Sequence, residues 1–386
     1  MVPNGWDCQP LSNLLAKVID YRGQSVPKAS HGVPLITARN VRDGYLDFTS
    51  QEFVSDQDFV SWMKRGTPRA GDILFTTEAP LGKACRFPET GRFAVGQRTV
   101  TLRTNSRLDS DYLLYFILSA HGQNLIDLRS SGSTAKGIKS SELKKVKVSF
   151  PESVPEQKKI AQILSTWDKA ITTTEQLLAN GQQHKKALMQ QLLTSKKRLL
   201  DKNGVRFSGE WKRVELGDLL NYQQPTPYLV ESTEYSNEFS TPVLTAGKTF
   251  ILGFTDEESG IFSEKLPAII FDDFTTDSKF VDFPFKAKSS AMKILTAKKG
   301  VSTKYAYEAM QLLDFAVGGH QRHWISIYSR LVIPFPGKEE QQKIAAVLST
   351  ADQEITVLQQ ELNALKQEKK ALMQQLLTGK RRVPLN

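Results

Sequence analysis

Cysteine is almost missing from this sequence, and so are long apolar runs. The 386 residues include two cysteines, Cys8 and Cys85, which lie far apart and belong to no C-x-x-C pair. A disulfide framework and a cysteine-ligated zinc site are therefore excluded, and a reducing intracellular setting is expected. No stretch approaches 18 apolar residues, and the first residues lack the basic and apolar regions of a signal peptide. We therefore expect a cytoplasmic protein.

Motifs for nucleotide and methyl-transfer chemistry are missing as well. The Gly-Lys pairs at 82–83, 247–248 and 337–338 lack the upstream glycine of a phosphate-binding loop. The sequence also has neither a glycine-rich cofactor turn nor an Asn/Asp-Pro-Pro-aromatic phrase, which transfer of a methyl group to adenine would need. The sequence therefore carries no motif for ATP-driven movement or for methyl transfer to adenine.

The composition has a modest excess of positive charge. The chain carries 51 Lys and Arg against 41 Asp and Glu, a net charge of +10. This excess favours a polyanionic partner, although mild basicity is also common in proteins without one. The charge is uneven, because residues 207–335 carry 13 basic against 16 acidic side chains. A nucleic-acid contact in that segment would need its basic residues gathered on one face.

A long duplicated segment is the main positive feature. Residues 156–198 align without gaps to residues 340–382 with 26 of 43 positions identical, and the decamer KKALMQQLLT occurs unchanged in both copies. Apolar residues recur in each copy with the 4-3 spacing of a heptad seam, which predicts two helices of roughly 65 Å. The predicted seam consists of Ile160, Leu164, Ile171, Leu178, Leu188, Leu192, Ile344, Leu348, Ile355, Leu362, Leu372 and Leu376.

The two predicted helices carry matching apolar seams, and two such seams in one chain most simply pack on each other. A parallel pair would require the roughly 140 intervening residues to bridge back along the whole rod, whereas an antiparallel pair requires no bridge. We therefore predict an antiparallel coiled coil with one globular domain at each end. Lys185 and Lys369 occupy seam positions where leucine would pack better, so we expect them to select the pairing register.

The segments between the helices predict two α+β domains. Strand-like runs at 72–77, 99–103 and 267–274, with helical patches at 111–120 and 304–313, indicate mixed sheets. The Trp-to-Leu spacing is the same at the start of both domains, and each domain ends in an alternating run that stops at a proline. The predicted boundaries are 1–151 for the first domain, 152–200 for the first helix, 201–336 for the second domain and 337–386 for the second helix.

These features together resemble the specificity subunit of type I restriction-modification systems over essentially the whole chain. The most specific marks are PEQKKIAQILSTWDKAI, EEQQKIAAVLSTADQEI, GDILFT, GSTAKGIKSSEL and PVLTAGKTFILGF. The resemblance implies a role in DNA methylation and host defence, in which each domain reads one half of a split double-stranded DNA target. It also implies that the helices set the spacer and dock two methyltransferase subunits. Motor-nuclease subunits would complete the complex. The resemblance further implies a non-catalytic chain with no metal and no cofactor of its own, and S-adenosylmethionine, ATP and Mg on the partner subunits.

A protein that recognises a DNA sequence needs basic and polar side chains on loops that fit into a groove of the duplex. The loop SGSTAKGIK in the first domain has this composition, although it also fits an ordinary Gly-Ser turn. The phrase GGHQRHW stands at the equivalent place in the second domain and offers readers of adenine and guanine. Four further basic residues are candidates that could equally be solvated surface charges. The predicted DNA contacts are Ser133, Thr134, Lys136, Lys139, Arg39, Arg42, Arg98, Lys248, Gln321, Arg322 and His323.

Two alternative functions compete with DNA reading. Asp272, Asp273 and Asp277 with Lys279 have the residue types of a metal-dependent nuclease, but Asp in a Thr-rich turn more commonly bonds backbone amides. His320 and His323 lack a neighbouring third metal ligand, which favours a polar loop. A helical scaffold that binds only proteins would explain the helices but not two divergent domains at equivalent positions.

Overall fold

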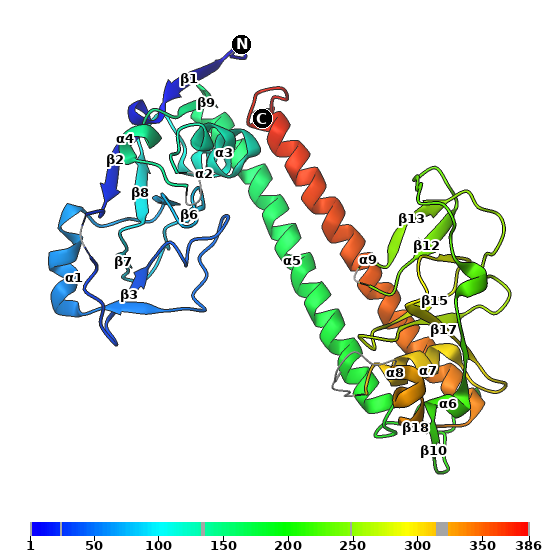
Figure 1. The fold of residues 1–386 in the computed structure, drawn as a ribbon. Coiled ribbons are helices and arrows are strands. Elements are labelled where there is room, and N and C mark those ends of the chain that lie inside the picture. Colours follow the sequence, from blue (N-terminus) through cyan, green and yellow to red (C-terminus); the bar gives the residue numbers. More distant parts are fainter. Residues whose placement is uncertain (1, 24, 133–135, 248, 314–322, 385–386) are drawn as a thin grey trace. The chain divides into compact units, whose positions relative to one another are not determined.

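The computed structural model describes residues 2–23, 25–132, 136–247, 249–313 and 323–384. Two compact units make up the chain: Met1–Glu175 with Gln360–Asn386 form the first unit, and Gln176–Gln359 form the second unit. The two long helices, α5 (Val154–Leu192) and α9 (Lys338–Leu376), each contribute one part to either unit (Figure 1). No helix in the described ranges is both long and apolar enough to cross a membrane.

The first unit contains an α+β domain with three small sheets. A four-stranded antiparallel sheet has the order β2-β8-β5-β6, a three-stranded sheet has the order β4-β3-β7 with β3 parallel to β7, and β1 pairs with β9. The strands are β1 Trp6–Pro10, β2 Leu15–Asp20, β3 Val33–Ile36, β4 Glu52–Val54, β5 Ile73–Thr76, β6 Ala84–Arg86, β7 Ala94–Val95, β8 Thr99–Thr104 and β9 Lys147–Pro151. The helices are α1 Asp56–Trp62, α2 Ser110–Leu118, α3 Ala120–Asp127 and α4 Ser140–Leu143.

The second unit repeats this topology strand for strand. Its sheets have the orders β11-β17-β14-β15, β13-β12-β16 with β12 parallel to β16, and β10-β18. The strands are β10 Lys212–Glu215, β11 Leu220–Gln223, β12 Thr241–Leu244, β13 Ile251–Thr255, β14 Ala268–Asp272, β15 Ser278–Val281, β16 Lys286–Ala287, β17 Met292–Ala297 and β18 Val332–Phe335. The helices are α6 Leu216–Leu219, α7 Thr303–Met310 and α8 His323–Ser326. The predicted α+β class with mixed sheets is confirmed in both units.

The duplication of the domains extends to single backbone hydrogen bonds. In the first unit the amide of Leu11 donates to the carbonyl of Val146 at 2.8 Å, and in the second unit Leu216 donates to Leu331 at 3.0 Å. Leu11 and Leu216 are the leucines of the matched Trp-to-Leu phrases. The short sequence match therefore marks a shared architecture, although the residues between the matches differ strongly.

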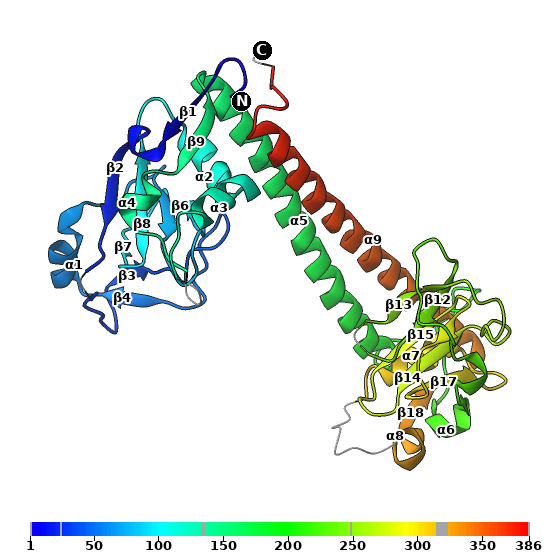
Figure 2. The same ribbon diagram turned by 45° about the horizontal axis from the view of Figure 1, so that its top comes forward.

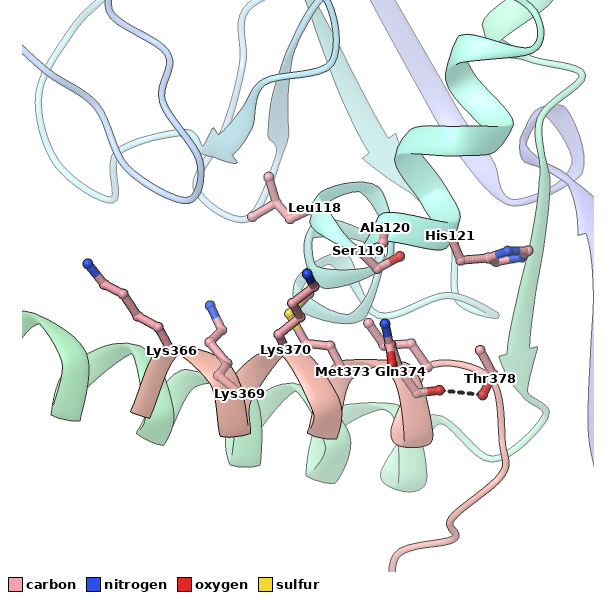
Figure 3. Close-up of a pocket in the computed structure, with 11 residues that line it drawn as sticks. Leu118, Ser119, Ala120, His121, Lys366, Lys369, Lys370, Met373, Gln374 and Thr378 are labelled. Atoms are coloured by element: carbon pink, nitrogen blue, oxygen red, sulfur yellow. Dashed lines mark hydrogen bonds between the residues drawn. The ribbon is translucent and has the colours of Figure 1, made fainter. Parts of the chain in front are cut away.

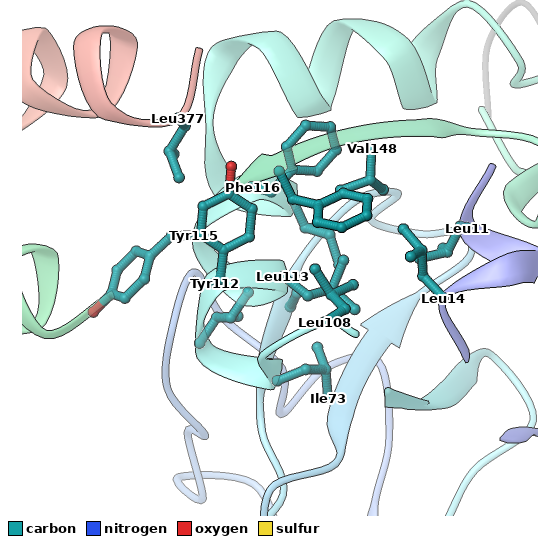
Figure 4. Packing of buried hydrophobic residues seen from close by; sticks show 14 of the residues in the cluster. Leu11, Leu14, Ile73, Leu108, Tyr112, Leu113, Tyr115, Phe116, Val148 and Leu377 are labelled. Atoms are coloured by element: carbon teal, nitrogen blue, oxygen red, sulfur yellow. The ribbon is translucent and has the colours of Figure 1, made fainter. Parts of the chain in front are cut away.

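Aromatic and aliphatic side chains of α2 form the centre of the first unit. Six of the nine residues of α2 are buried, because the helix lies between the sheets and the long helices. Tyr112, Phe116, Val148 and Leu11 belong to this buried cluster (Figure 4). The hydroxyl of Tyr112 donates to the carbonyl of Ser149 at 2.8 Å, which satisfies the one polar atom of this buried ring.

The ends of the long helices complete the domain cores. Ile160 and Leu164 of α5 and Leu376 of α9 are at most 2% exposed and belong to the core of the first unit. Leu192 and Leu348 are equally buried in the core of the second unit, together with Ile344. The predicted seam residues near the helix ends thus pack against a domain as well as along the helix pair. None of the twelve predicted seam residues is exposed.

Within each unit the two long helices run antiparallel. In the first unit Lys369 pairs with Asp168 and Lys366 pairs with Glu175, so residue numbers rise along α5 as they fall along α9 (Figure 2). In the second unit Lys185 pairs with Asp352. There an added Cβ at Gly181 would lie 3.6 Å from Cγ1 of Ile355. The predicted antiparallel coiled-coil pair is confirmed.

Both long helices end earlier than their sequences predict. They stop at Leu192 and Leu376, because Ser195 and Gly379 adopt the left-handed conformation with φ of 59° and 70°. Two basic clusters, Lys196 to Arg198 and Lys380 to Arg382, therefore follow the helices. Within the first cluster Arg198 forms an ion pair with Glu340, with Nε 2.6 Å from Oε1.

Candidate nucleic-acid interface

A short turn between β7 and β8 in the first unit is fixed at both ends by backbone hydrogen bonds. The amide of Gly96 donates to the carbonyl of Ile36 at 2.8 Å, and the carbonyl of Arg98 accepts from the amide of Thr77 at 3.1 Å. The backbone of the turn is therefore tied to the domain. Arg98 is exposed and Gln97 is partly exposed.

A polar hollow of about 350 Å³ opens beside this turn. Arg39 and Arg98, two of the residues predicted to contact DNA, both line it, although they lie 59 positions apart in the chain. The other lining residues were missed, since nothing in their local sequence distinguishes them from surface residues. These are Ser25, Val26, Lys28, Leu35, Thr37, Ala38, Glu52, Ala79, Gly96 and Gln97.

The two arginines of the hollow make fewer internal polar contacts than most other arginines of the first unit. Arg39 makes no hydrogen bond or ion pair with any described residue, and the guanidinium of Arg98 makes only an exposed ion pair, with Nε 3.3 Å from Oε1 of Glu78. Most of the other arginines are held by acidic side chains. These pairs are Arg22–Asp20, Arg42–Asp47, Arg86–Asp111, Arg92–Asp56, Arg103–Asp72, Arg107–Asp7 and Arg129–Glu142.

Arg42 is one of these structural arginines. Its Nη2 lies 3.1 Å from Oδ2 of Asp47. The pKa of Asp47 is lowered, first by the hydrogen bonds from the amide and hydroxyl of Thr49 and then by Arg42. Arg42 therefore helps to close a turn, and it does not line the hollow described above.

The described end of the predicted Gly-Ser loop contacts the segment that follows β5. Ser133 and Thr134 lie outside the described residues. Downstream, Gly137 forms a backbone bridge with Glu78, the ion-pair partner of Arg98, and Lys136 forms an exposed ion pair with Asp127 at 2.6 Å. Lys139 is exposed at the start of α4. The loop and the β7–β8 turn thus meet at Glu78.

His323 is buried, contrary to the predicted DNA contact. Its side chain is 0% exposed, and its amide donates to the carbonyl of Asp273 at 3.0 Å. In the first unit the amide of Ile138, also buried, donates to the carbonyl of Thr77 at 2.9 Å in the matching place. His323 therefore occupies a core position of the shared fold. Lys248, Gln321 and Arg322 lie outside the described residues.

The three aspartates considered for a nuclease site have local structural partners. Oδ1 of Asp272 accepts from the amide of Phe274 at 2.9 Å, and Oδ1 of Asp273 accepts from the amide of Trp324 at 2.9 Å. Asp277 pairs with Lys279 two residues along the chain. Across the described ranges, no group of three or more His, Cys, Asp or Glu is placed to hold a metal ion.

The second unit has its own version of the β7–β8 turn. The amide of Lys288 donates to the carbonyl of Leu244 at 2.8 Å, as Gly96 does to Ile36. The turn then continues with the exposed Ser289 and Ser290 in place of glutamine and arginine. A sequence signal for this equivalence exists in the phrases PLITA at 34–38 and PVLTA at 242–246, which begin in β3 and β12.

A second surface of interest lies on α9 in the first unit. A pocket of about 390 Å³ separates α9 from the segment that joins α2 to α3, and Figure 3 shows Lys366, Lys369 and Lys370 along the α9 side. Much of that side belongs to the repeated decamer at 369–378. The lining residues are Leu118, Ser119, Ala120, His121, Lys366, Lys369, Lys370, Met373, Gln374, Leu377 and Thr378.

The two seam lysines form cross-helix ion pairs. In the second unit Nζ of Lys185 lies 2.6 Å from Oδ1 of Asp352 and 3.1 Å from Oε2 of the buried Glu308. In the first unit Lys369 pairs with Asp168, which also accepts a hydrogen bond from the hydroxyl of Tyr115 at 2.7 Å. Each lysine therefore finds its acidic partner at one pairing register.

Comparison with known proteins agrees with this architecture. The family model for the type I restriction modification DNA specificity domain matches residues 25–180 and 208–367. The EcoR124I/EcoR124II specificity subunit of Escherichia coli is 50% identical over 145 residues, which cover 36% of this chain and 35% of that protein. The type I restriction enzyme MjaX specificity subunit of Methanocaldococcus jannaschii is 25% identical over 99% of this chain and 95% of its own.

Solved structures share the fold. The type I restriction-modification S subunit from M. genitalium has a TM-score of 0.68 at 15% identity and covers 100% of this chain and 99% of its own. A chain from a study of complex assembly and conformational transition in the type I system has a TM-score of 0.55 at 14% identity, covering 99% and 100%. Because the family model covers most of both units, the chain belongs to the type I restriction modification DNA specificity family.

Proposed function

We propose that this chain is the non-catalytic recognition subunit of a type I restriction-modification complex, and that each unit reads one half of a bipartite DNA target. One observation carries the proposal. The two units share strand order and individual backbone hydrogen bonds, yet the side chains on their equivalent turns differ. Recognition of two different half-sites requires this combination, a shared backbone fold that carries different side chains on equivalent turns.

In each unit, side chains at the rim of the DNA-reading surface would contact phosphates, and side chains at its floor would contact base edges. In the first unit, Arg39, Lys28 and the loop with Lys136 and Lys139 supply exposed positive charge beside the hollow. Phosphate contacts fix the register on the duplex and carry no sequence information, while base-edge contacts specify. The globular domain of the second unit, residues 207–335, is slightly acidic. Its phosphate contacts would need its basic side chains to lie together on one face.

The helix pair would set the spacer between the half-sites. Two modules that address the same face of B-DNA read sites about 10 to 10.5 bp apart, centre to centre. The lysine–aspartate pairs support a fixed helix register, because a shift of one heptad would separate each lysine from its partner. The bases in the spacer would be left unread.

The repeated decamer would dock two methyltransferase subunits. Lys370 and Gln374 of the first unit and Lys186 and Gln190 of the second are exposed at identical positions of the repeat. Exposed helix residues usually tolerate substitution, and those just before the decamer do differ between the two copies. The exposed residues of the decamer are unchanged, which suits binding of the same partner by both copies. The methyltransferase and motor-nuclease partners would hold S-adenosylmethionine, ATP and Mg.

Mapping of methylated adenines tests the proposed function. The chain is expressed with its methyltransferase subunits in a host that lacks adenine methylation, and modified adenines are located by sequencing. We expect one motif with two specified halves and a gap of constant length. An uninterrupted motif would overturn the bipartite model. DNA cleavage by the isolated chain with a divalent metal would favour a nuclease, and failure to shift any duplex would favour a protein scaffold.

Docking is tested separately by charge reversal on the repeat. We expect Lys370→Glu and Lys186→Glu each to weaken capture of one of the two methyltransferase copies, and the double variant to lose both. Glu361→Lys reverses an exposed charge of α9 outside the decamer and serves as the control. Unchanged two-to-one stoichiometry in the double variant would place the docking surface elsewhere.

A further inference from the structure

We propose that Gln97 and Arg98 read base edges in one half of the target. This inference rests on the proposed function and assigns it to two side chains of the β7–β8 turn. The turn is short, polar and outward-facing, and it lines two adjoining hollows of about 350 and 400 Å³. Both hollows include Gln97 and Arg98 among their lining residues.

The backbone of the turn is organised before any ligand arrives. Gly96 donates to the carbonyl of Ile36, Thr99 donates to the carbonyl of Gly96 at 3.2 Å, and the carbonyl of Arg98 accepts from Thr77. These bonds tie the turn to β3 and to the end of β5. Because the backbone is already ordered, binding would cost only the rotamer freedom of the side chains.

The two side chains are also uncommitted. Within the described part of the chain, the amide group of Gln97 has no hydrogen-bond partner, and the guanidinium of Arg98 donates no hydrogen bond. The ion pair between Arg98 and Glu78 is about half exposed on both sides, 54% and 50%. Exposed pairs of this kind add little stability, so Arg98 can exchange Glu78 for a base at small cost.

The chemistry of the pair defines the bases. An arginine fork matches O6 and N7 of guanine, and a glutamine amide matches N6 and N7 of adenine, both in the major groove. Glu78, once released, can accept from N4 of the cytosine that pairs with guanine. Arg39, on the same hollow, makes no ion pair or hydrogen bond with a described residue and suits a phosphate.

The second unit offers a different set of groups at the same place. Ser289 and Ser290 follow Lys288 where Gln97 and Arg98 follow Gly96. Phe274 follows Asp273 where Glu78 follows Thr77, and its ring is 45% exposed. Serine hydroxyls bond several bases, and an exposed ring suits a thymine methyl group. The two turns would therefore select different base pairs.

Arg98→Ala and Gln97→Ala test the inference in the complex with methyltransferase subunits. We expect each variant to relax one base pair in one half-site, while the other half and the gap stay unchanged. Binding to the original target should fall about 10- to 100-fold for Arg98→Ala, with no fall on duplexes already changed at that base pair. Arg98→Lys should also relax the position, because lysine lacks the planar fork.

The controls separate base reading from other roles. Both side chains are solvent-accessible, so unchanged thermal unfolding is expected and shows that the variants fold. Ser289→Ala with Ser290→Ala should alter the other half-site only. Equal weakening on all sequences would make Arg98 a phosphate contact, and an unchanged motif would remove both residues from recognition; either result overturns the inference. Failure of the wild-type chain to give a bipartite motif would instead refute the proposed function.

Discussion

Lys185 of α5 places its ammonium 2.6 Å from the carboxylate of Asp352 on α9. Lys369 of α9 makes the matching pair with Asp168 of α5. The duplication therefore supplies each unit with one lysine from one helix and one aspartate from the other. A polar contact along an apolar seam favours one register, since a slipped pairing would leave each mostly buried lysine without its carboxylate partner.

Replacement of Lys185 by leucine is expected to destabilise the second unit. From the seam position alone, leucine would be expected to stabilise the helices. The structure reverses this expectation, because Lys185 neutralises Asp352 and the fully buried Glu308. We expect a loss of about 1–3 kcal/mol, less than for a fully buried pair, since Lys304 remains beside both carboxylates. Urea unfolding measures the loss, and the exposed Lys186→Leu is the control.

The same network predicts a pH dependence. Burial raises the pKa of Asp352, but hydrogen bonds from Lys185 and Lys304 outweigh burial and lower it below its ordinary value of 3.8. The pair therefore contributes stability that is present above pH 3.8 and is lost as the pH falls through the lowered pKa. We expect Asp352→Asn to be less stable than wild type at pH 6, with a difference that shrinks below pH 4. A constant difference in urea midpoints would refute this.

Arg382→Ala is expected to loosen the start of α5. Arg382 forms a bidentate pair with the buried Glu156 and donates to the carbonyl of Asn4 at 2.7 Å. Its loss leaves a buried carboxylate unpaired, so we expect a cost of about 1–3 kcal/mol. Arg198→Ala should have a similar effect through Glu340. Arg381→Ala, at an exposed neighbouring side chain, should stay within about 0.5 kcal/mol of wild type in the same unfolding assay.

Arg39→Ala is expected to weaken DNA binding without changing sequence preference. Arg39 is exposed on the rim of the hollow and makes no internal ion pair with a described residue. Loss of one phosphate contact should lower affinity on all duplexes and reduce the slope of log affinity against log salt by about 1. Filter binding at several salt concentrations checks this. A changed methylation motif would show that Arg39 reads a base.

His323→Ala should act on stability rather than on recognition. The side chain is fully buried at the position that Ile138 holds in the first unit. Removal of a buried side chain of this size leaves a cavity, and we expect a loss of about 2–4 kcal/mol, similar to that of Ile138→Ala. Unfolding curves and the methylation motif are compared for both variants. Normal stability with a relaxed motif would restore His323 as a DNA contact.

Part of this architecture was predictable because it depends on local sequence. The 4-3 spacing predicted two long helices, alternating runs predicted β9 and β18, and the Trp-to-Leu phrases marked equivalent domain starts. The helix ends were predicted too late, because the two copies of the repeat continue to Arg198 and Arg382. Ser195 and Gly379 end the helices through their backbone conformation, which the match between the copies does not reveal.

The residues of the proposed DNA-reading surface could be predicted only in part. Arg39 and Arg98 were among many exposed basic residues, and only the fold shows that they share one hollow. Arg42 has the same chemistry but is held by Asp47. The role of an arginine depends on the acceptors within a few ångströms, and those come from distant parts of the chain.

By itself, the sequence determined the duplicated helices, their antiparallel pairing and the α+β class of two divergent domains, because periodicity and repetition are properties of neighbouring residues. Tertiary structure alone decided that His323 lies in a core, that Lys185 neutralises Glu308, and that Arg98 makes only an exposed ion pair with Glu78 on a fixed turn. Each of these features depends on the burial of a side chain or on the distance between charged groups from segments far apart in the sequence. Only the packing of the folded chain sets these quantities.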